Sequence, residues 1–126
     1  MTKKLKGKTT VITGGAGAIG KSTAKRFLEE GASVLLVDLK EDDLKSAVDE
    51  LGGNGVYYAV ADVSKADDVI NYAHAARQQF DKVDIFFNNA GIEGVVKPIS
   101  EYPVEEFDKV MAVNVRGVWL GMKYMI

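Results

Sequence analysis

The stretch TVITGGAGAIGKS, residues 10–22, decides the fold, because a β-branched run leads directly into a cluster of glycines. The run TTVIT, residues 9–13, is typical of a buried strand, and the segment after the glycines has the apolar spacing of a helix. The glycines fit three spacings: G-x-G-x-x-G from Gly15, T-G-x-x-G-x-x-G from Thr13, and T-G-x-x-x-G-x-G, in which Ala18 replaces the middle glycine. All three describe a nucleotide-binding turn that points backbone amides at a diphosphate.

The same alternation of strand and helix continues along the chain. Apolar runs at 33–38, 56–62 and 83–91 predict three further strands, the last one with its turn, and amphipathic segments between them predict helices. A last helix is expected from about residue 103 to the C-terminus. Near-continuous apolar strands separated by helices imply a parallel sheet covered on both faces. Right-handed crossovers then predict an α/β fold, a Rossmann-type doubly wound sheet with strand order 3-2-1-4.

Each predicted helix has one apolar face that we expect to pack on the sheet. The inward residues are expected to be Ile19, Ala24, Phe27 and Leu28, then Leu44, Ala47, Val48 and Leu51, and then Val69, Ala73, Ala76 and Phe80. Gly31 is expected to end the first of these helices. Ser64 and Asp67 have the spacing of a capping box that begins the third.

Composition excludes several classes of function. The formal net charge of −2 predicts no attraction to nucleic acid or to an anionic membrane. The chain has no cysteine, which excludes disulfides and thiol catalysis and fits a cytoplasmic protein. Residues 9–20 are apolar but short and broken by glycines, so we expect neither a secretory signal nor a membrane span. His74 has no other ligand residues at suitable spacing, so no metal site is expected.

Two acidic residues stand where predicted strands end, which is where such sheets bind ligands. Asp38 can accept hydrogen bonds from both hydroxyls of an adenosine ribose, although a helix-capping role is the alternative. Its charge would repel a 2′-phosphate, so NAD is favoured over NADP; Lys21 and Lys40 are the residues that could reverse this preference. Asp62 can meet the amino group of adenine, with Val63 against the ring, unless this segment is an ordinary loop before a helix.

The segment NNAG, residues 88–91, is a sharper signal. Two adjacent asparagines follow an apolar strand and are followed by two small residues. Amide side chains can form hydrogen bonds there, and the small residues let the backbone pass close to a ligand. An asparagine-rich turn without a ligand is the alternative.

Together, TGGAGAIG, Asp38, DV at 62–63, NNAG and NV at 114–115 make the chain resemble the short-chain dehydrogenase/reductase family over essentially its whole length. NNAG is characteristic of the compact branch of that family, whose glycine code is T-G-x-x-x-G-x-G. The third spacing is therefore favoured, with Ala18 as a departure from it. The resemblance implies an NAD-dependent oxidoreductase that transfers a hydride between a secondary alcohol or ketone and the nicotinamide.

The resemblance also implies which residues contact the cofactor. They are Gly14, Gly17, Ala18, Ile19 and Gly20 in the turn, Asp38 and Leu39 at the ribose, Asp62 and Val63 at the adenine, and Asn89, Ala90 and Gly91 in the middle. Asn114 matches the family's helix asparagine, one of four catalytic residues, which helps to hold a water in the proton relay. Because it lies on an apolar stripe of the last helix, a structural bend is its alternative role.

Other features of the family concern whether residues 1–126 form a whole enzyme and whether copies of the chain associate. The sequence contains no Y-x-x-x-K, the tyrosine and lysine that the family uses with a serine in acid/base catalysis. Family members carry those residues in their second half, so residues 1–126 are expected to be an incomplete, N-terminal NAD-binding portion that is inactive alone. Gly117 and Gly121, one helical turn apart, predict the close approach of another backbone. The family uses this helix at a subunit interface, which implies a homo-oligomer.

Two other functions remain open. A naturally short, non-catalytic dinucleotide-binding or interaction module would need no Y-x-x-x-K. An extended-branch epimerase or dehydratase acting on a sugar nucleotide would share the glycine turn, but NNAG disfavours it. For the leading hypothesis the expected partners are a small alcohol or ketone and further copies of the chain, with no nucleic acid and no membrane.

Overall fold

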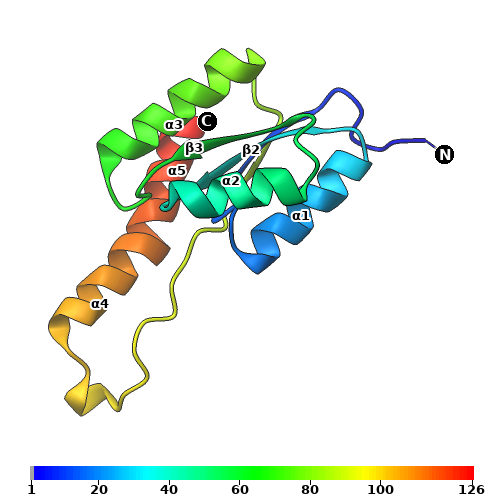
Figure 1. Ribbon diagram of the computed structural model, residues 1–126. Coiled ribbons are helices and arrows are strands. Elements are labelled where there is room, and N and C mark those ends of the chain that lie inside the picture. The colour runs from blue at the N-terminus through cyan, green and yellow to red at the C-terminus, as the bar shows by residue number, and fades with distance from the viewer. Residues whose placement is uncertain (1) are drawn as a thin grey trace.

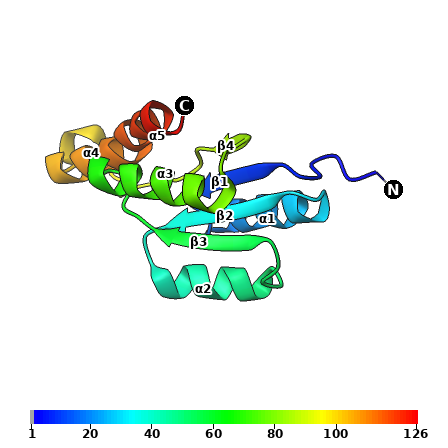
Figure 2. The same cartoon turned by 90° about the horizontal axis from the view of Figure 1, so that it is seen from above.

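The structure is a computed structural model that describes residues 2–126. Within these residues, four parallel strands form one sheet in the order β3-β2-β1-β4. The strands are β1 (Thr9–Thr13), β2 (Ser33–Asp38), β3 (Val56–Val60) and β4 (Ile85–Phe87). The helices are α1 (Ala18–Glu29), α2 (Glu41–Glu50), α3 (Ala66–Phe80), α4 (Val104–Met111) and α5 (Gly117–Met125), with the short segments η1 (Ile99–Glu101) and η2 (Ala112–Arg116). The predicted fold and strand order are confirmed (Figures 1 and 2).

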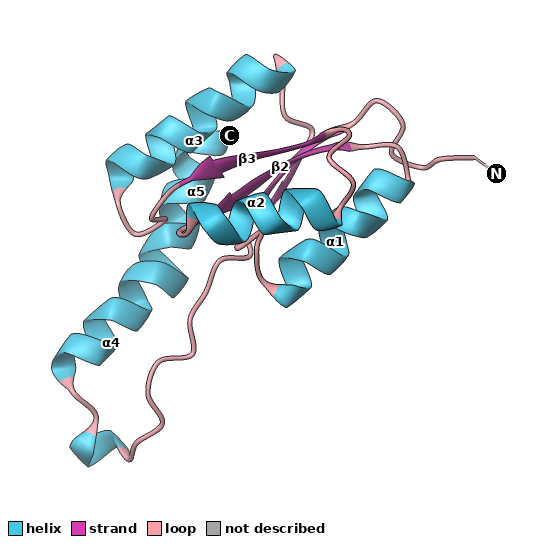
Figure 3. Ribbon diagram, viewed as in Figure 1, coloured by secondary structure: helices cyan, strands magenta, loops and turns pink. Residues whose placement is uncertain are grey.

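The sheet separates two apolar layers, because successive residues of a strand point to opposite faces. Val11 and Leu35, which are register partners in β1 and β2, pack toward α3 and α5. Ile12 and Leu36, the next pair, pack toward α1 and α2. The arrangement of the helices about the sheet is seen in Figure 3. Both central strands are therefore buried on both faces, as their near-continuous apolar sequences predict.

Most of the predicted helix faces are confirmed. The fully buried members are Ala24, Leu44, Ala47, Val69, Ala73 and Ala76, while Phe27, Leu28, Val48, Leu51 and Phe80 are partly buried against the same two layers. Ile19 is wrong as a core residue, since its side chain is 68% exposed. It belongs to the first turn of α1, beside the glycine turn, where it reaches the cleft described below instead of the sheet.

The ends of two helices test the capping predictions. Gly31 has φ +93° immediately after α1, so its predicted role in ending the helix is confirmed. The capping box is wrong: Lys65 precedes α3, and within residues 2–126 no side chain caps that helix. The Ser64 hydroxyl instead donates to Asp62 Oδ1 at 2.6 Å. Because α3 starts at Ala66, the N-cap position falls on Lys65, and Ser64 lies one residue too early to cap the helix.

The last helix is interrupted. It begins at Val104, close to the predicted start, but η2 is a π-helical segment in which the Gly117 N–H bonds to the Ala112 carbonyl. The apolar stripe expected around Asn114 consists of Phe107, Val110/Met111, Val118 and Gly121/Met122, and it is wrong as one inward face, because Phe107 and Met122 are exposed. Met111 is exposed on the outer surface, whereas Gly121 is buried. Within residues 2–126, no helix is both long enough and apolar enough to cross a membrane.

Candidate functional site

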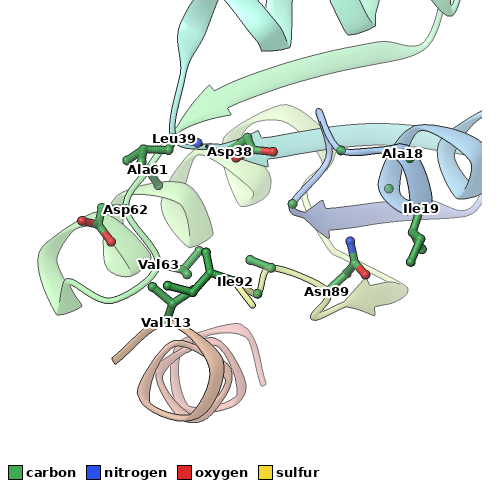
Figure 4. A pocket seen from close by; sticks show the side chains of 15 residues that line it. Ala18, Ile19, Asp38, Leu39, Ala61, Asp62, Val63, Asn89, Ile92 and Val113 are labelled. Atoms are coloured by element: carbon green, nitrogen blue, oxygen red, sulfur yellow. Dashed lines mark hydrogen bonds between the residues drawn. The ribbon is translucent and has the colours of Figure 1, made fainter. Parts of the chain in front are cut away.

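A cleft of about 430 Å³ lies at the carboxyl ends of the strands. Its lining includes every residue expected to contact a cofactor, namely Gly14, Gly17, Ala18, Ile19, Gly20, Asp38, Leu39, Asp62, Val63, Asn89, Ala90 and Gly91. Asp62 lies at one end of the cleft and Asn89 with Ile19 at the other (Figure 4). Residues that follow β1, β2, β3 and β4 therefore meet in one elongated cavity.

Three lining residues were missed by the sequence analysis: Ala61, Ile92 and Val113. In Figure 4 the side chains of Val63, Ile92 and Val113 lie close together on one wall of the cleft. Ile92 directly follows NNAG, and Val113 directly precedes Asn114. Their positions next to two recognised motifs could have indicated that they line the cleft. The wall itself forms only because η2 lies beside the loop after β4.

The glycine turn after β1 requires residues without a Cβ. Gly14 has φ +66°, and a Cβ there would lie 3.0 Å from Asn89 Nδ2. A Cβ on Gly20 would collide with the Gly14 carbonyl oxygen. Gly17 is the residue before α1, and within residues 2–126 no side chain caps that helix. The first amides of α1 therefore face the cleft with the positive end of the helix dipole, which favours an anion.

Asp38 is tied to this turn by its own carboxylate. Oδ2 accepts the Ala16 N–H at 3.0 Å, and Oδ1 accepts the Leu39 N–H at 2.8 Å. The alternative helix-capping role is wrong, because Lys40 precedes α2 and no side chain in the described residues 2–126 caps that helix. The carboxylate is thus oriented at the cleft by two backbone amides. Each oxygen still has a lone pair for a further donor.

The two asparagines of NNAG have different partners. The backbone amides of Asn89 and Ala90 both donate to Thr13 Oγ1, at 2.9 and 3.0 Å, and Asn89 Nδ2 donates to the Thr13 carbonyl at 3.2 Å. Asn88 Nδ2 instead donates to the Val118 carbonyl at 2.9 Å. Asn89 therefore fastens the segment to the end of β1, and Asn88 fastens it to α5. Thr13, a fully buried polar residue, was missed as the acceptor that holds this corner.

Asn114 lies beside the cleft and does not line it. Its Oδ1 accepts the Ile92 N–H and its Nδ2 donates to the Ile92 carbonyl, both at 2.8 Å. A Cβ on Gly91 would lie 3.3 Å from the same Oδ1, so NNAG must end in a very small residue for this contact to form. The side chain of Asn114 thus holds the loop after β4 against η2.

The predicted close approach at the two helix glycines occurs within the chain. A Cβ on Gly117 would lie 3.2 Å from the Val63 carbonyl oxygen, and a Cβ on Gly121 would lie 2.9 Å from Phe86 Cζ. The first contact is to both the side chain and the backbone of Val63, with Cγ2 at 3.0 Å, so the predicted approach of a backbone is met only in part, and the second contact is to a side chain. Both glycines let the last helix approach residues at the strand ends.

Asp62 is held by the residue that was expected to cap α3. Its Oδ1 accepts both the hydroxyl of Ser64 at 2.6 Å and the Ser64 N–H at 3.0 Å. The Ser64 hydroxyl is the main cause that lowers the pKa of Asp62, against the opposing effect of partial burial. The carboxylate is therefore ionised at neutral pH and acts only as an acceptor.

The chain is similar to known proteins that carry the same kind of fold. A family model described as short chain dehydrogenase matches residues 8–126. Tropinone reductase-like 1 of Erythroxylum coca is 42% identical over 125 residues, which cover 97% of this chain and 46% of that protein. Levodione reductase of Leifsonia aquatica is 40% identical over 129 residues, which cover 99% of this chain and 48% of that protein. The chain spans about half the length of the curated relatives it matches.

The three-dimensional structure is also similar to solved structures. The crystal structure of 3-ketoacyl-(acyl-carrier-protein) reductase from Brucella melitensis, complexed with NADH, matches with a TM-score of 0.93 and 39% sequence identity. The match covers 98% of this chain and 50% of that one.

Proposed function

Because the chain belongs to the short-chain dehydrogenase/reductase family, we propose that it forms the N-terminal, NAD-binding portion of an oxidoreductase. The reaction is hydride transfer between the nicotinamide and a secondary alcohol or ketone. One observation carries the proposal: Asp38, Asp62 and Asn89 follow three different strands and line the same elongated cleft. The bound NAD supplies the carbon that accepts or donates the hydride, and the chain binds and orients it.

The proposed roles follow the cleft from end to end. Asp62 and Val63 bind the adenine, Asp38 and Leu39 bind the adenosine ribose, and the turn at residues 14–20 binds the diphosphate. Asn89, Ala90 and Gly91 contact the middle of the dinucleotide. The glycine turn supports this assignment, since a Cβ on Gly20 or Gly14 would press on neighbouring atoms of the turn or of NNAG, so the tight shape of the turn depends on these glycines. Free amides at the start of α1 suit a diphosphate.

We propose NAD as the cofactor in preference to NADP. The Asp38 carboxylate would repel a 2′-phosphate near the ribose. Of the two lysines that could counter this effect, Lys21 is paired with Glu50 on α2, with Nζ and Oε2 3.1 Å apart. Lys40 is exposed immediately before α2, so it is the lysine that could still reverse the preference.

The Asp38→Asn variant tests the ribose assignment. We expect its affinity for NADH to fall by about 10-fold, since hydrogen bonds to a charged group contribute roughly 1.5–3 kcal/mol, and we expect its preference for NADH over NADPH to shrink. Titration of the full-length protein, followed by nicotinamide fluorescence, measures both. Asp42→Asn, the same change at an exposed acid in α2, is the control. Equal affinities of Asp38→Asn and the parent protein for NADH would contradict the assignment.

Asn114 is proposed to contribute to catalysis by position. Both polar atoms of its side chain bind Ile92, whose side chain lines the cleft wall. It therefore holds the backbone next to NNAG, at the end of the cleft assigned to the middle of the dinucleotide.

The activity itself is tested by incubating the full-length protein with NAD and a panel of secondary alcohols. An NADH-binding protein that oxidises none of them, and reduces none of the ketones, would favour the non-catalytic module.

We also propose that the protein is a homo-oligomer. A stripe of exposed apolar residues runs along α4, η2 and α5: Phe107, Met111, Val115 and Trp119, each four positions after the last. Trp119 is 54% exposed, which is unusual for so large an apolar side chain unless a partner covers it. A second copy of the same helix would bury the stripe on both sides.

The Trp119→Glu variant tests this interface. A charge within an apolar interface loses its hydration, so we expect the variant to elute as a smaller species than the parent protein in size-exclusion chromatography with light scattering. Ile70→Glu, at an exposed position on α3, should leave the size unchanged. A parent protein that is monomeric over the whole concentration range would contradict the proposal.

A cytoplasmic location is proposed from composition. The chain has no cysteine, which suits a reducing compartment. Its net charge of −2 provides no attraction to anionic membranes.

A further inference from the structure

The loop between β3 and α3, residues 61–65, is held in place from several sides. Arg116 Nε, from η2, donates to the Ser64 carbonyl at 3.1 Å. Gly117 fits against Val63, as described above. The Asp62 N–H donates to Asp68 Oδ2, in the first turn of α3, at 2.8 Å. The position of this loop is therefore set by η2, α5 and α3 without help from a ligand.

Within this loop, Ser64 orients the carboxylate of Asp62. Its hydroxyl and its N–H both donate to the same oxygen, Oδ1, at 2.6 and 3.0 Å. Among residues 2–126, no protein group donates a hydrogen bond to Asp62 Oδ2. One oxygen is thus fixed by Ser64, and the other is available at the end of the cleft that Asp62 lines.

An ionised carboxylate in this position can distinguish purines. Adenine carries an exocyclic amino group at its carbon 6, which donates a hydrogen bond. Hypoxanthine carries a carbonyl oxygen at the same carbon, so two acceptors would face each other, and an unpaired acceptor in a cleft is unfavourable. The discrimination requires that the carboxylate keep its orientation, and the two bonds from Ser64 provide it.

From these contacts we propose that Ser64 is a positioning residue that makes Asp62 select adenine over 6-oxopurines in the dinucleotide. This inference rests on the proposed function, because it assumes that the Asp62 end of the cleft holds the base. Arg116 supports the same arrangement through the carbonyl of Ser64. Ser64 itself need not touch the ligand.

The test compares NADH with reduced nicotinamide hypoxanthine dinucleotide, which differs only in the base. Both are titrated into the full-length protein and followed by nicotinamide fluorescence. We expect the parent protein to bind NADH about 10-fold more tightly. In Ser64→Ala this ratio should fall to about 3-fold or less, because only the backbone N–H bond is left to orient the Asp62 carboxylate. Ser64→Thr keeps the hydroxyl and should preserve the ratio.

A control variant and two distinct outcomes separate the inference from the proposed function. Ser46→Ala, at an exposed position on α2, should change neither affinity. A Ser64→Ala protein that loses the same factor of affinity for both dinucleotides, or that keeps the parent ratio, would overturn the inference and leave the proposed function intact. A folded parent protein that binds neither dinucleotide would overturn the proposed function and the inference with it.

Discussion

Thr13→Val is expected to lower the free energy of unfolding by about 1–3 kcal/mol, because it leaves two partly buried amides without their acceptor, and a fully buried unsatisfied donor costs roughly 1–3 kcal/mol. Thr13 Oγ1 accepts the N–H groups of Asn89 and Ala90, at 2.9 and 3.0 Å, and its side chain is fully buried. Valine has nearly the same shape as threonine, so the change removes these bonds without leaving a cavity. The segment NNAG should loosen, and NADH binding should weaken as well.

Thr10→Val is the matched control. Thr10 lies in the same strand and is equally buried, but its Oγ1 has no hydrogen-bond partner among residues 2–126. Replacing an unpaired hydroxyl with a methyl removes a desolvation cost, so we expect no loss of stability, or a gain of about 1 kcal/mol. Urea unfolding of the two variants and the parent protein measures the difference. Equal destabilisation by both variants would show that β1 simply does not tolerate valine.

The second large effect is expected at the glycine turn. Gly20→Ala should weaken NADH binding by at least about 100-fold, which corresponds to roughly 2.7 kcal/mol. The new Cβ would collide with the Gly14 carbonyl oxygen and would lie 2.9 Å from Gly15 Cα. Both neighbours are backbone, so the whole turn has to shift to make room. Its amides would then no longer point at the diphosphate.

Gly17→Ala provides the comparison within the same turn. Its Cβ would meet the Gly14 carbonyl oxygen at 3.4 Å, which is an ordinary contact. We expect a loss of less than about 3-fold in NADH affinity, equivalent to under roughly 0.7 kcal/mol. Circular dichroism of both variants checks that the fold survives. If Gly20→Ala bound NADH as well as Gly17→Ala does, the proposed placement of the diphosphate would be wrong.

Local patterns in the sequence were sufficient to predict the strand order and to bring Asp38, Asp62 and Asn89 to one edge of the sheet, whereas the other cofactor contacts were implied by the family resemblance. Apolar runs with the right period predict strands and helices, and the handedness of crossovers restricts their topology. Once the sheet is parallel, every strand points its carboxyl end to the same edge. Asp38, Asp62 and Asn89 follow such strands, so their convergence depends on rules that hold for any sheet of this type.

The tertiary structure alone decided which groups bind one another. Thr13 and Ala90 are 77 positions apart, and Asn114 and Ile92 are 22 positions apart, so no local pattern links them. Ser64 was predicted as a helix cap, but α3 begins one residue later than that requires, and its hydroxyl donates to Asp62. The π-helical segment η2 likewise changed which side of the last helix is buried. Periodicity and chain topology determine where elements lie, whereas hydrogen-bond partners depend on atoms that meet only after those elements have packed.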